Sequence, residues 1–165
     1  IAQGNVDGLF NPDSRITRAE FAAMVARAMG LAPDSPSDPT FSDVPSTAWY
    51  YSVVETLAKA GVVTGYEGRF RPDAPVSRQE MMVMMVRALG KDNEAASLSS
   101  EAISAALKFG DAAALSAYAR GSAAIAVQQG LVEGDPDGNL TPVNSSSRAE
   151  AATMVLRLIR KLGII

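Results

Sequence analysis

Thr17-Arg18-Ala19-Glu20 opens an apolar run, and closely related stretches occur twice more in the chain, as Ser77-Arg78-Gln79-Glu80 and Ser147-Arg148-Ala149-Glu150. Successive copies of this motif lie 60 and 70 residues apart. Self-similarity at such a spacing indicates one supersecondary unit that is repeated along the chain. We therefore interpret the 165 residues as about three copies of one unit, and we expect functional sites where the copies meet.

Working outward from the motif gives the boundaries of the copies. We predict a single module over residues 1–165, with a partial first repeat over 1–31, a second over 41–90 and a third over 109–162. The first repeat lacks the stretch that forms a first helix in the others. A helix of roughly 15 residues is therefore expected before Ile1 in the intact protein.

Each complete copy is predicted to contain two helices separated by a glycine-rich turn, which makes the fold all-α. In the second copy the first helix is expected over Thr47–Ala60, ending at Gly61. Its buried face is expected to consist of Trp49, Val53, Val54, Leu57 and Ala58. The second helices are predicted over residues 18–29, 78–89 and 148–162, and a short additional helix over 101–107, capped by Ser99 or Ser100.

The hydroxyl residue and the glutamate of the motif form a capping box. The hydroxyl accepts from the third helical amide, and the glutamate accepts from the amide of the cap residue. We assign structural capping to Thr17, Glu20, Ser77, Glu80, Ser147 and Glu150.

The arginine of the motif is not explained by capping. It stands at the first helical position, where the positive end of the helix dipole disfavours a cation. Three such arginines indicate an anionic partner. That partner is either an internal carboxylate such as Asp13, Asp43 or Asp73, or an anionic ligand that also uses free amides at the helix start.

Composition excludes several classes of function. The chain has no histidine and no cysteine, which removes histidine-based acid–base catalysis, thiol chemistry and the usual zinc sites. Its net charge of -3 argues against general nucleic-acid binding. No apolar run is long enough for membrane insertion. We expect no cofactor and no resident metal.

Three stretches of the second copy carry a family resemblance: Phe41-Ser42-Asp43-Val44-Pro45, Ala60-Gly61-Val62-Val63-Thr64-Gly65-Tyr66, and the run from Phe70 to Glu80. Together they resemble the S-layer homology (SLH) domain, which occurs as three tandem copies with a Thr-Arg-Ala-Glu signature. The resemblance implies a pseudo-threefold all-α spindle of three SLH repeats with grooves between them. It also implies a secreted, non-enzymatic module of the bacterial cell wall or S-layer.

The resemblance further implies an anionic ligand. SLH modules bind secondary cell wall polysaccharides, of which the best-known type carries pyruvate ketals on N-acetylmannosamine. Carried over by position, the expected ligand-binding residues are Arg18, Arg78, Arg148, Trp49, Gly65, Tyr66 and Gly4. Arg18 and Arg78 are expected to contact the acidic group, with Trp49 against the sugar ring, in a site that combines the first two copies.

The third copy departs from this pattern. Pro142-Val143 replaces the Pro-Asp pair of the other copies, and Tyr118 stands in place of Trp49. Its groove is therefore expected to bind poorly or not at all. S-layer self-association through regions outside this chain would be compatible with the resemblance.

Three other functions compete with glycan binding. A carboxylate-based glycosidase needs a pair of free carboxylates, but the recurrent glutamate is already used as a cap. A calcium site is suggested by Asp135-Pro136-Asp137-Gly138, although the twelfth position counted from Glu133 is Asn144 rather than glutamate. A self-associating module could use the methionine-rich stretch Met81–Met85 as a partner groove, but a packed core explains that stretch more simply.

Overall fold

The chain folds into helices joined by turns. The computed structural model describes residues 8–164, and within that range no β-strand is present, which confirms the all-α prediction. The elements are α1 Arg18–Met29, α2 Tyr51–Lys59, α3 Arg78–Ala88, α4 Asp92–Ser97, α5 Ser100–Ala106, α6 Arg120–Gln128 and α7 Arg148–Lys161, with 3₁₀ turns at Ala112–Ala114 and Ala117–Ala119. As the repeat predicts, α1, α3 and α7 begin at the motif arginines.

Three short extended segments meet where the copies join, and they form a closed ring of backbone hydrogen bonds. Ile16 N donates to Ser146 O at 3.1 Å, Ser146 N donates to Val76 O at 3.1 Å, and Val76 N donates to Ile16 O at 3.0 Å. All three residues are buried, so these bonds satisfy polar groups that water cannot reach. Because each segment leads into α1, α3 or α7, the ring relates the copies by pseudo-threefold symmetry.

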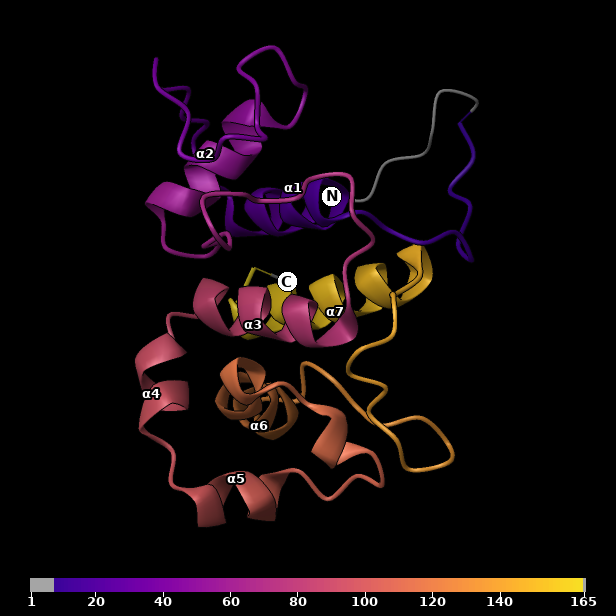
Figure 1. The fold of residues 1–165 in the computed structure, drawn as a ribbon. Helices are drawn as coiled ribbons and strands as arrows, with labels where there is room; N and C mark the ends of the chain where they lie inside the picture. The colour runs from indigo at the N-terminus through magenta and orange to yellow at the C-terminus, as the bar shows by residue number, and fades with distance from the viewer. Residues whose placement is uncertain (1–7, 165) are drawn as a thin grey trace.

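The two helices of one copy do not pack against each other. Instead α2 packs on α1 and α6 packs on α3, while no contact joins α2 to α3 or α6 to α7 in the described part of the chain. Figure 1 shows α3 and α7 in the middle, with α1 and α2 on one side and α4, α5 and α6 on the other. Each copy thus buries its apolar helix faces against a neighbouring copy.

The methionine-rich stretch belongs to the central core. Met81, Met82, Met84 and Met85 are at most 3% exposed, and they lie in α3, which contacts both α1 and α7. This burial confirms the packed-core interpretation.

Trp49 departs from the predicted buried face. The first helix of the second copy, α2, begins at Tyr51 rather than Thr47, because a succession of turns follows Pro45. Trp49 therefore precedes the helix and is 61% exposed. Tyr50 is buried instead, and its ring meets the Trp49 ring edge-on at a centroid distance of 5.4 Å. The placement of Trp49 on the core stripe was wrong.

The connector between the second and third copies forms two short helices, of which the sequence predicted one. α5 has Ser99 as its cap, and the Ser99 hydroxyl accepts from Ala102 N at 3.2 Å. α4 was missed because Ala95 is its single buried side chain, so it shows no apolar period. Gly121 lets α4 approach α6 closely, since a Cβ there would stand 2.2 Å from Ala95 O.

α2 packs on α1, and α6 packs on α3. No helix in the described residues packs on α7 in the same way. Leu156 of α7 is 39% exposed, whereas the equivalent Ala26 and Val86 are 8% and 0% exposed. The helix expected before Ile1 lies outside the described residues, and so does Gly4.

Candidate functional site

The motif arginines pair with the motif glutamates of another copy. The three contacts run in one direction around the pseudo-threefold axis and close into a cycle. They are Arg18 Nη1 to Glu80 Oε1 at 2.8 Å, Arg78 Nη1 to Glu150 Oε1 at 3.4 Å, and Arg148 Nη1 to Glu20 Oε1 at 3.0 Å. An internal carboxylate therefore accounts for the arginine at the first helical position.

Each motif glutamate divides its two oxygens between two contacts. Glu80 Oε2 accepts from Ser77 N at 2.8 Å and completes the capping box, while Glu80 Oε1 accepts from Arg18. Asp43, which the sequence offered as a partner for the arginine, accepts from Phe70 N and Arg71 N instead, both at 2.8 Å. Asp43 and Asp111 thus brace the loops before the second and third motifs, and the repeated glutamate holds the arginine.

The amides at the helix starts are used within the protein. Arg18 N donates to Ala74 O and Ala19 N donates to Pro72 O, both at 3.0 Å, while Glu20 N donates to the Thr17 hydroxyl at 3.2 Å. α3 and α7 repeat this pattern with loops of other copies. The hypothesis of free helix-start amides was wrong, so these amides are not available to an anionic ligand.

The guanidinium of Arg18 is fixed on several sides. Its Nε donates to Phe70 O at 2.8 Å, and its Cζ lies 5.0 Å from the centroid of the Phe70 ring. The side chain is 11% exposed, and its Nη2 donates to no residue within 8–164. Burial lowers the pKa of Arg18 from its ordinary value, with Glu80 acting in the opposite direction.

A groove opens beside Arg18 at the junction of the copies, and we name it the Arg18 groove. Its volume is about 410 Å³, within the range of roughly 300–1,000 Å³ typical of small-molecule sites. It is lined by Arg18 of α1, by residues 62–66 and 69–71 of the second copy, by Glu80, Val83, Met84 and Arg87 of α3, and by Tyr118 of the third copy.

Arginines dominate the Arg18 groove. Arg18, Arg69, Arg71 and Arg87 line it, against Glu80 as the single lining carboxylate. The side chains of Arg69 and Arg71 are exposed and form no ion pair with residues 8–164. Because Arg18 already neutralises Glu80, the groove keeps an excess of positive charge that favours an anion.

Two tyrosines flank the same groove. Tyr66 is 68% exposed and Tyr118 is 62% exposed. Burial and the carboxylate of Glu80 raise the pKa of Tyr118, against the effect of Arg18 and Arg71. Its hydroxyl therefore remains a hydrogen-bond donor at neutral pH, and its ring offers an apolar face.

A second groove beside Arg78 has a different character. This Arg78 groove, of about 360 Å³, is lined by two arginines, by three carboxylates and by no aromatic side chain. Both arginines are paired, Arg78 with Glu150 and Arg157 with Glu133 at 2.8 Å. Arg78 also donates to Glu133 O at 2.9 Å, while its buried Nε has no partner within the described chain. Little positive charge is left for a ligand.

The structure brings together only part of the expected site. Gly65 and Tyr66 line the Arg18 groove with Arg18, as expected for a site between the first two copies. Arg78 lines its own groove instead, and Trp49 lines neither. A Cβ on Gly65 would lie 2.3 Å from Arg69 O, so this glycine is required by its own turn.

Arg148, the third arginine expected to bind the ligand, contacts the first repeat in the way that Arg18 contacts the second. The guanidinium of Arg148 lies 5.2 Å from the centroid of the Phe10 ring, and its Nε donates to Phe10 O at 2.9 Å. The segment that would line a groove here includes residues outside the described range. Because Trp49 corresponds in sequence to Tyr118, the pseudo-threefold relation associates Trp49 with Arg148 rather than with Arg78.

Sequence reasoning missed Arg69, Arg71 and Arg87. Arg87 recurs at the same position of each second helix, as Arg27 and Arg157, and this period could have revealed it. Arg69 and Arg71 flank Phe70, whereas Leu140 of the third copy is flanked by Asn139 and Thr141. A comparison of charge between the copies would have identified this loop as the basic one.

The segment that resembles a calcium loop is a turn. Asp135 Oδ1 accepts from Asp137 N at 3.0 Å and from Asn139 N at 2.8 Å. Within residues 8–164 no three acidic side chains gather as a metal site would need. Every helix in that range is too short or too polar to span a lipid bilayer.

Comparison with known proteins agrees with the repeat. The sequence matches the S-layer homology domain family over residues 1–22, 40–82 and 108–152. It is 34% identical to an amylopullulanase of Thermoanaerobacterium thermosulfurigenes over 100% of this chain and 9% of that protein. It is 30% identical to the exoglucanase XynX of Acetivibrio thermocellus over 98% of this chain and 14% of that protein. The S-layer protein sap of Bacillus anthracis is also 30% identical, over 98% of this chain and 19% of that protein.

The chain therefore spans less than a fifth of the length of these relatives, and the enzymes among them match it only through this region. S-layer proteins and enzymes share the region, which serves anchoring rather than catalysis and locates its bearer at the cell surface. With its three matched segments and its pseudo-threefold helical architecture, the chain belongs to the S-layer homology domain family.

Proposed function

We propose that the Arg18 groove binds an acidic sugar of a secondary cell wall polysaccharide and thereby anchors the protein to the wall. The observation that carries this proposal is the pair Arg69 and Arg71, two exposed arginines that form no ion pair with any described residue and lie beside the fixed guanidinium of Arg18. A carboxylate placed there would accept charge-assisted hydrogen bonds.

The two tyrosines supply the rest of a sugar site. Sugar rings carry apolar faces, and aromatic side chains with a hydroxyl can cover such a face and bond to the ring oxygens. Tyr66 and Tyr118 flank the arginines in this way. A pyruvate ketal on N-acetylmannosamine combines a carboxylate with a pyranose ring, so it is the ligand that we propose.

We propose no anion site in the Arg78 groove. Its two arginines are matched by three carboxylates, and a bound anion would face Glu133, Asp135 and Glu150. One basic groove therefore dominates binding among the described residues.

Calorimetric titration with the pyruvate ketal of N-acetylmannosamine tests the proposal. Arg71→Ala should weaken binding by about 10-fold or more, because a charged hydrogen bond is worth about 1.5–3 kcal/mol. Arg71→Lys should restore the affinity only in part, since the planar fork of the guanidinium is lost.

Two variants serve as matched controls. Arg160→Ala removes an exposed arginine at the end of α7 and corrects for the change in net charge, and Arg78→Ala tests the other groove. Both should bind nearly as wild type does. Equal affinity of wild type and Arg71→Ala, or equal losses in Arg71→Ala and Arg160→Ala, would contradict the proposal.

A further inference from the structure

We infer that a pocket between α4, α5 and α6 is a second subsite, which binds the next sugar of the polysaccharide whose acidic sugar occupies the Arg18 groove. The inference rests on the proposed function and deepens it. It assigns to the protein an extended site for two adjoining sugars, in which Arg120 donates hydrogen bonds to oxygens of the second one.

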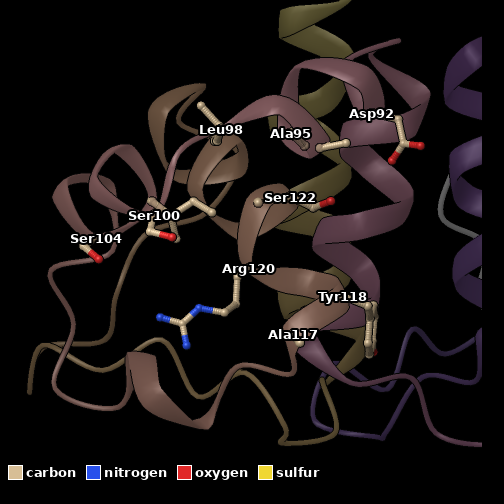
Figure 2. Close-up of a pocket in the computed structure, with 12 residues that line it drawn as sticks. Asp92, Ala95, Leu98, Ser100, Ser104, Ala117, Tyr118, Arg120 and Ser122 are labelled. Atoms are coloured by element: carbon tan, nitrogen blue, oxygen red, sulfur yellow. The ribbon is translucent and has the colours of Figure 1, made fainter.

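The pocket, of about 370 Å³, lies across the start of α6 and is named here the α4–α6 pocket. Its lining includes Asp92 and Ala95 of α4, Ser100 and Ser104 of α5, and residues 117, 118 and 120–122 at the start of α6. Figure 2 shows the Arg120 side chain reaching toward the side on which Ser100 and Ser104 lie, while Tyr118 stands on the opposite side. The pocket is thus polar at one side and aromatic at the other.

Arg120 differs from the other partly buried arginines of the chain. Arg18, Arg78, Arg87, Arg148 and Arg157 each pair with a carboxylate. The Arg120 side chain is also partly buried, yet within residues 8–164 it forms no ion pair and no hydrogen bond. A guanidinium that lines a pocket and has no partner among the described residues is available to an acceptor supplied by a ligand.

The rest of the lining matches a sugar ring. Ala95, Leu98 and Ile103 present apolar carbon, and the hydroxyls of Ser100, Ser104 and Ser122 can both donate and accept hydrogen bonds. A pyranose likewise alternates apolar faces with hydroxyl groups. The lining exposes more polar than apolar surface, as suits a sugar that carries many hydroxyl groups.

The two cavities adjoin each other. Tyr118 lines both the Arg18 groove and the α4–α6 pocket. Arg87 of the groove pairs with Asp92 of the pocket, at 3.3 Å between Nε and Oδ1. A polymer that leaves the groove over the Tyr118 ring therefore enters the pocket without crossing unrelated surface.

The pocket occurs at one position in the described chain. Its walls α4 and α5 come from the long connector between the second and third copies, and the connector between the first and second copies forms no helix. The extended site is thus built by an insertion in one repeat junction rather than by the repeat itself.

Titration with two probes tests the inference. The first is the pyruvate ketal of N-acetylmannosamine as a monosaccharide, and the second is a purified pyruvylated wall-polysaccharide fragment of several sugars. Arg120→Ala should weaken binding of the fragment by about 5- to 10-fold and leave monosaccharide binding unchanged, because the lost hydrogen bonds belong to the second sugar alone. Ser104→Trp, which fills the pocket from the exposed face of α5, should have the same selective effect.

The controls separate this inference from the proposed function. Arg160→Ala should bind both probes as wild type does, and circular dichroism should show wild-type helix content in all variants. Equal fragment binding by Arg120→Ala, Ser104→Trp and Arg160→Ala overturns the second subsite while the groove assignment stands. A loss of monosaccharide binding in Arg120→Ala with its helices intact also overturns it. If Arg71→Ala binds both probes as wild type does, the proposed function itself fails.

Discussion

At the scale of single residues, the repeated motif serves two kinds of contact at once. Within each helix the hydroxyl and one glutamate oxygen form the cap, which alone is worth about 1 kcal/mol. Between copies, the arginine and the other glutamate oxygen form an ion pair. The motif therefore ties local helix formation to the assembly of the three copies.

Replacing the motif glutamates should expose this double role. Glu80→Ala should lower the free energy of unfolding by about 2–3 kcal/mol, because it removes the cap and leaves the nearly buried Arg18 unpaired. Glu150→Ala should cost about 1 kcal/mol, since its pair is longer and its side chain is 46% exposed. Urea unfolding measures both values, and equal losses would show that the Arg18 pair adds nothing to the cap.

At the scale of elements, a close approach of two helices shapes the α4–α6 pocket. Gly121 lies in α6, where alanine would ordinarily stabilise a helix by about 1 kcal/mol. Here a Cβ would meet Ala95 O at 2.2 Å, so the helices must separate.

Gly121→Ala should therefore destabilise the protein by about 1–3 kcal/mol in spite of its better helix propensity. The variant should also increase proteolysis between α4 and α5, which thermolysin digestion under native conditions would report. Gln128→Ala, at an exposed position of the same helix, serves as the control and should be neutral or slightly stabilising. A stabilised Gly121→Ala protein would show that α4 can move away without cost.

At the scale of the whole molecule, the exchange of helices makes the three copies depend on one another. α2 packs on α1 and α6 on α3, and every motif helix donates its first amides to a loop of another copy. Each copy in the described chain buries apolar helix faces against another copy, so we expect the module to unfold as one cooperative unit.

A core substitution in the third copy should therefore be detected in the second. Leu158→Ala, at a fully buried position of α7, should cost about 2–5 kcal/mol. Trp49 is the one tryptophan of the sequence, so its fluorescence reports on the second copy. The unfolding midpoint measured by this fluorescence should shift to a lower denaturant concentration, together with the midpoint measured by circular dichroism. A fluorescence midpoint that stays at its wild-type value would mean that the copies unfold separately.

The linear pattern was enough to predict the repeat, the all-α class, the starts of α1, α3 and α7 and their capping boxes. These features follow from interactions between residues three or four apart, which a linear pattern records. Three features could be seen only in the folded chain: Arg18 meets Glu80, Arg69 and Arg71 form no ion pair with the described residues, and Tyr118 rather than Trp49 lines the Arg18 groove. The residues of each Arg–Glu pair lie 62 to 128 positions apart, and they meet only because the helices of each copy pack against those of another.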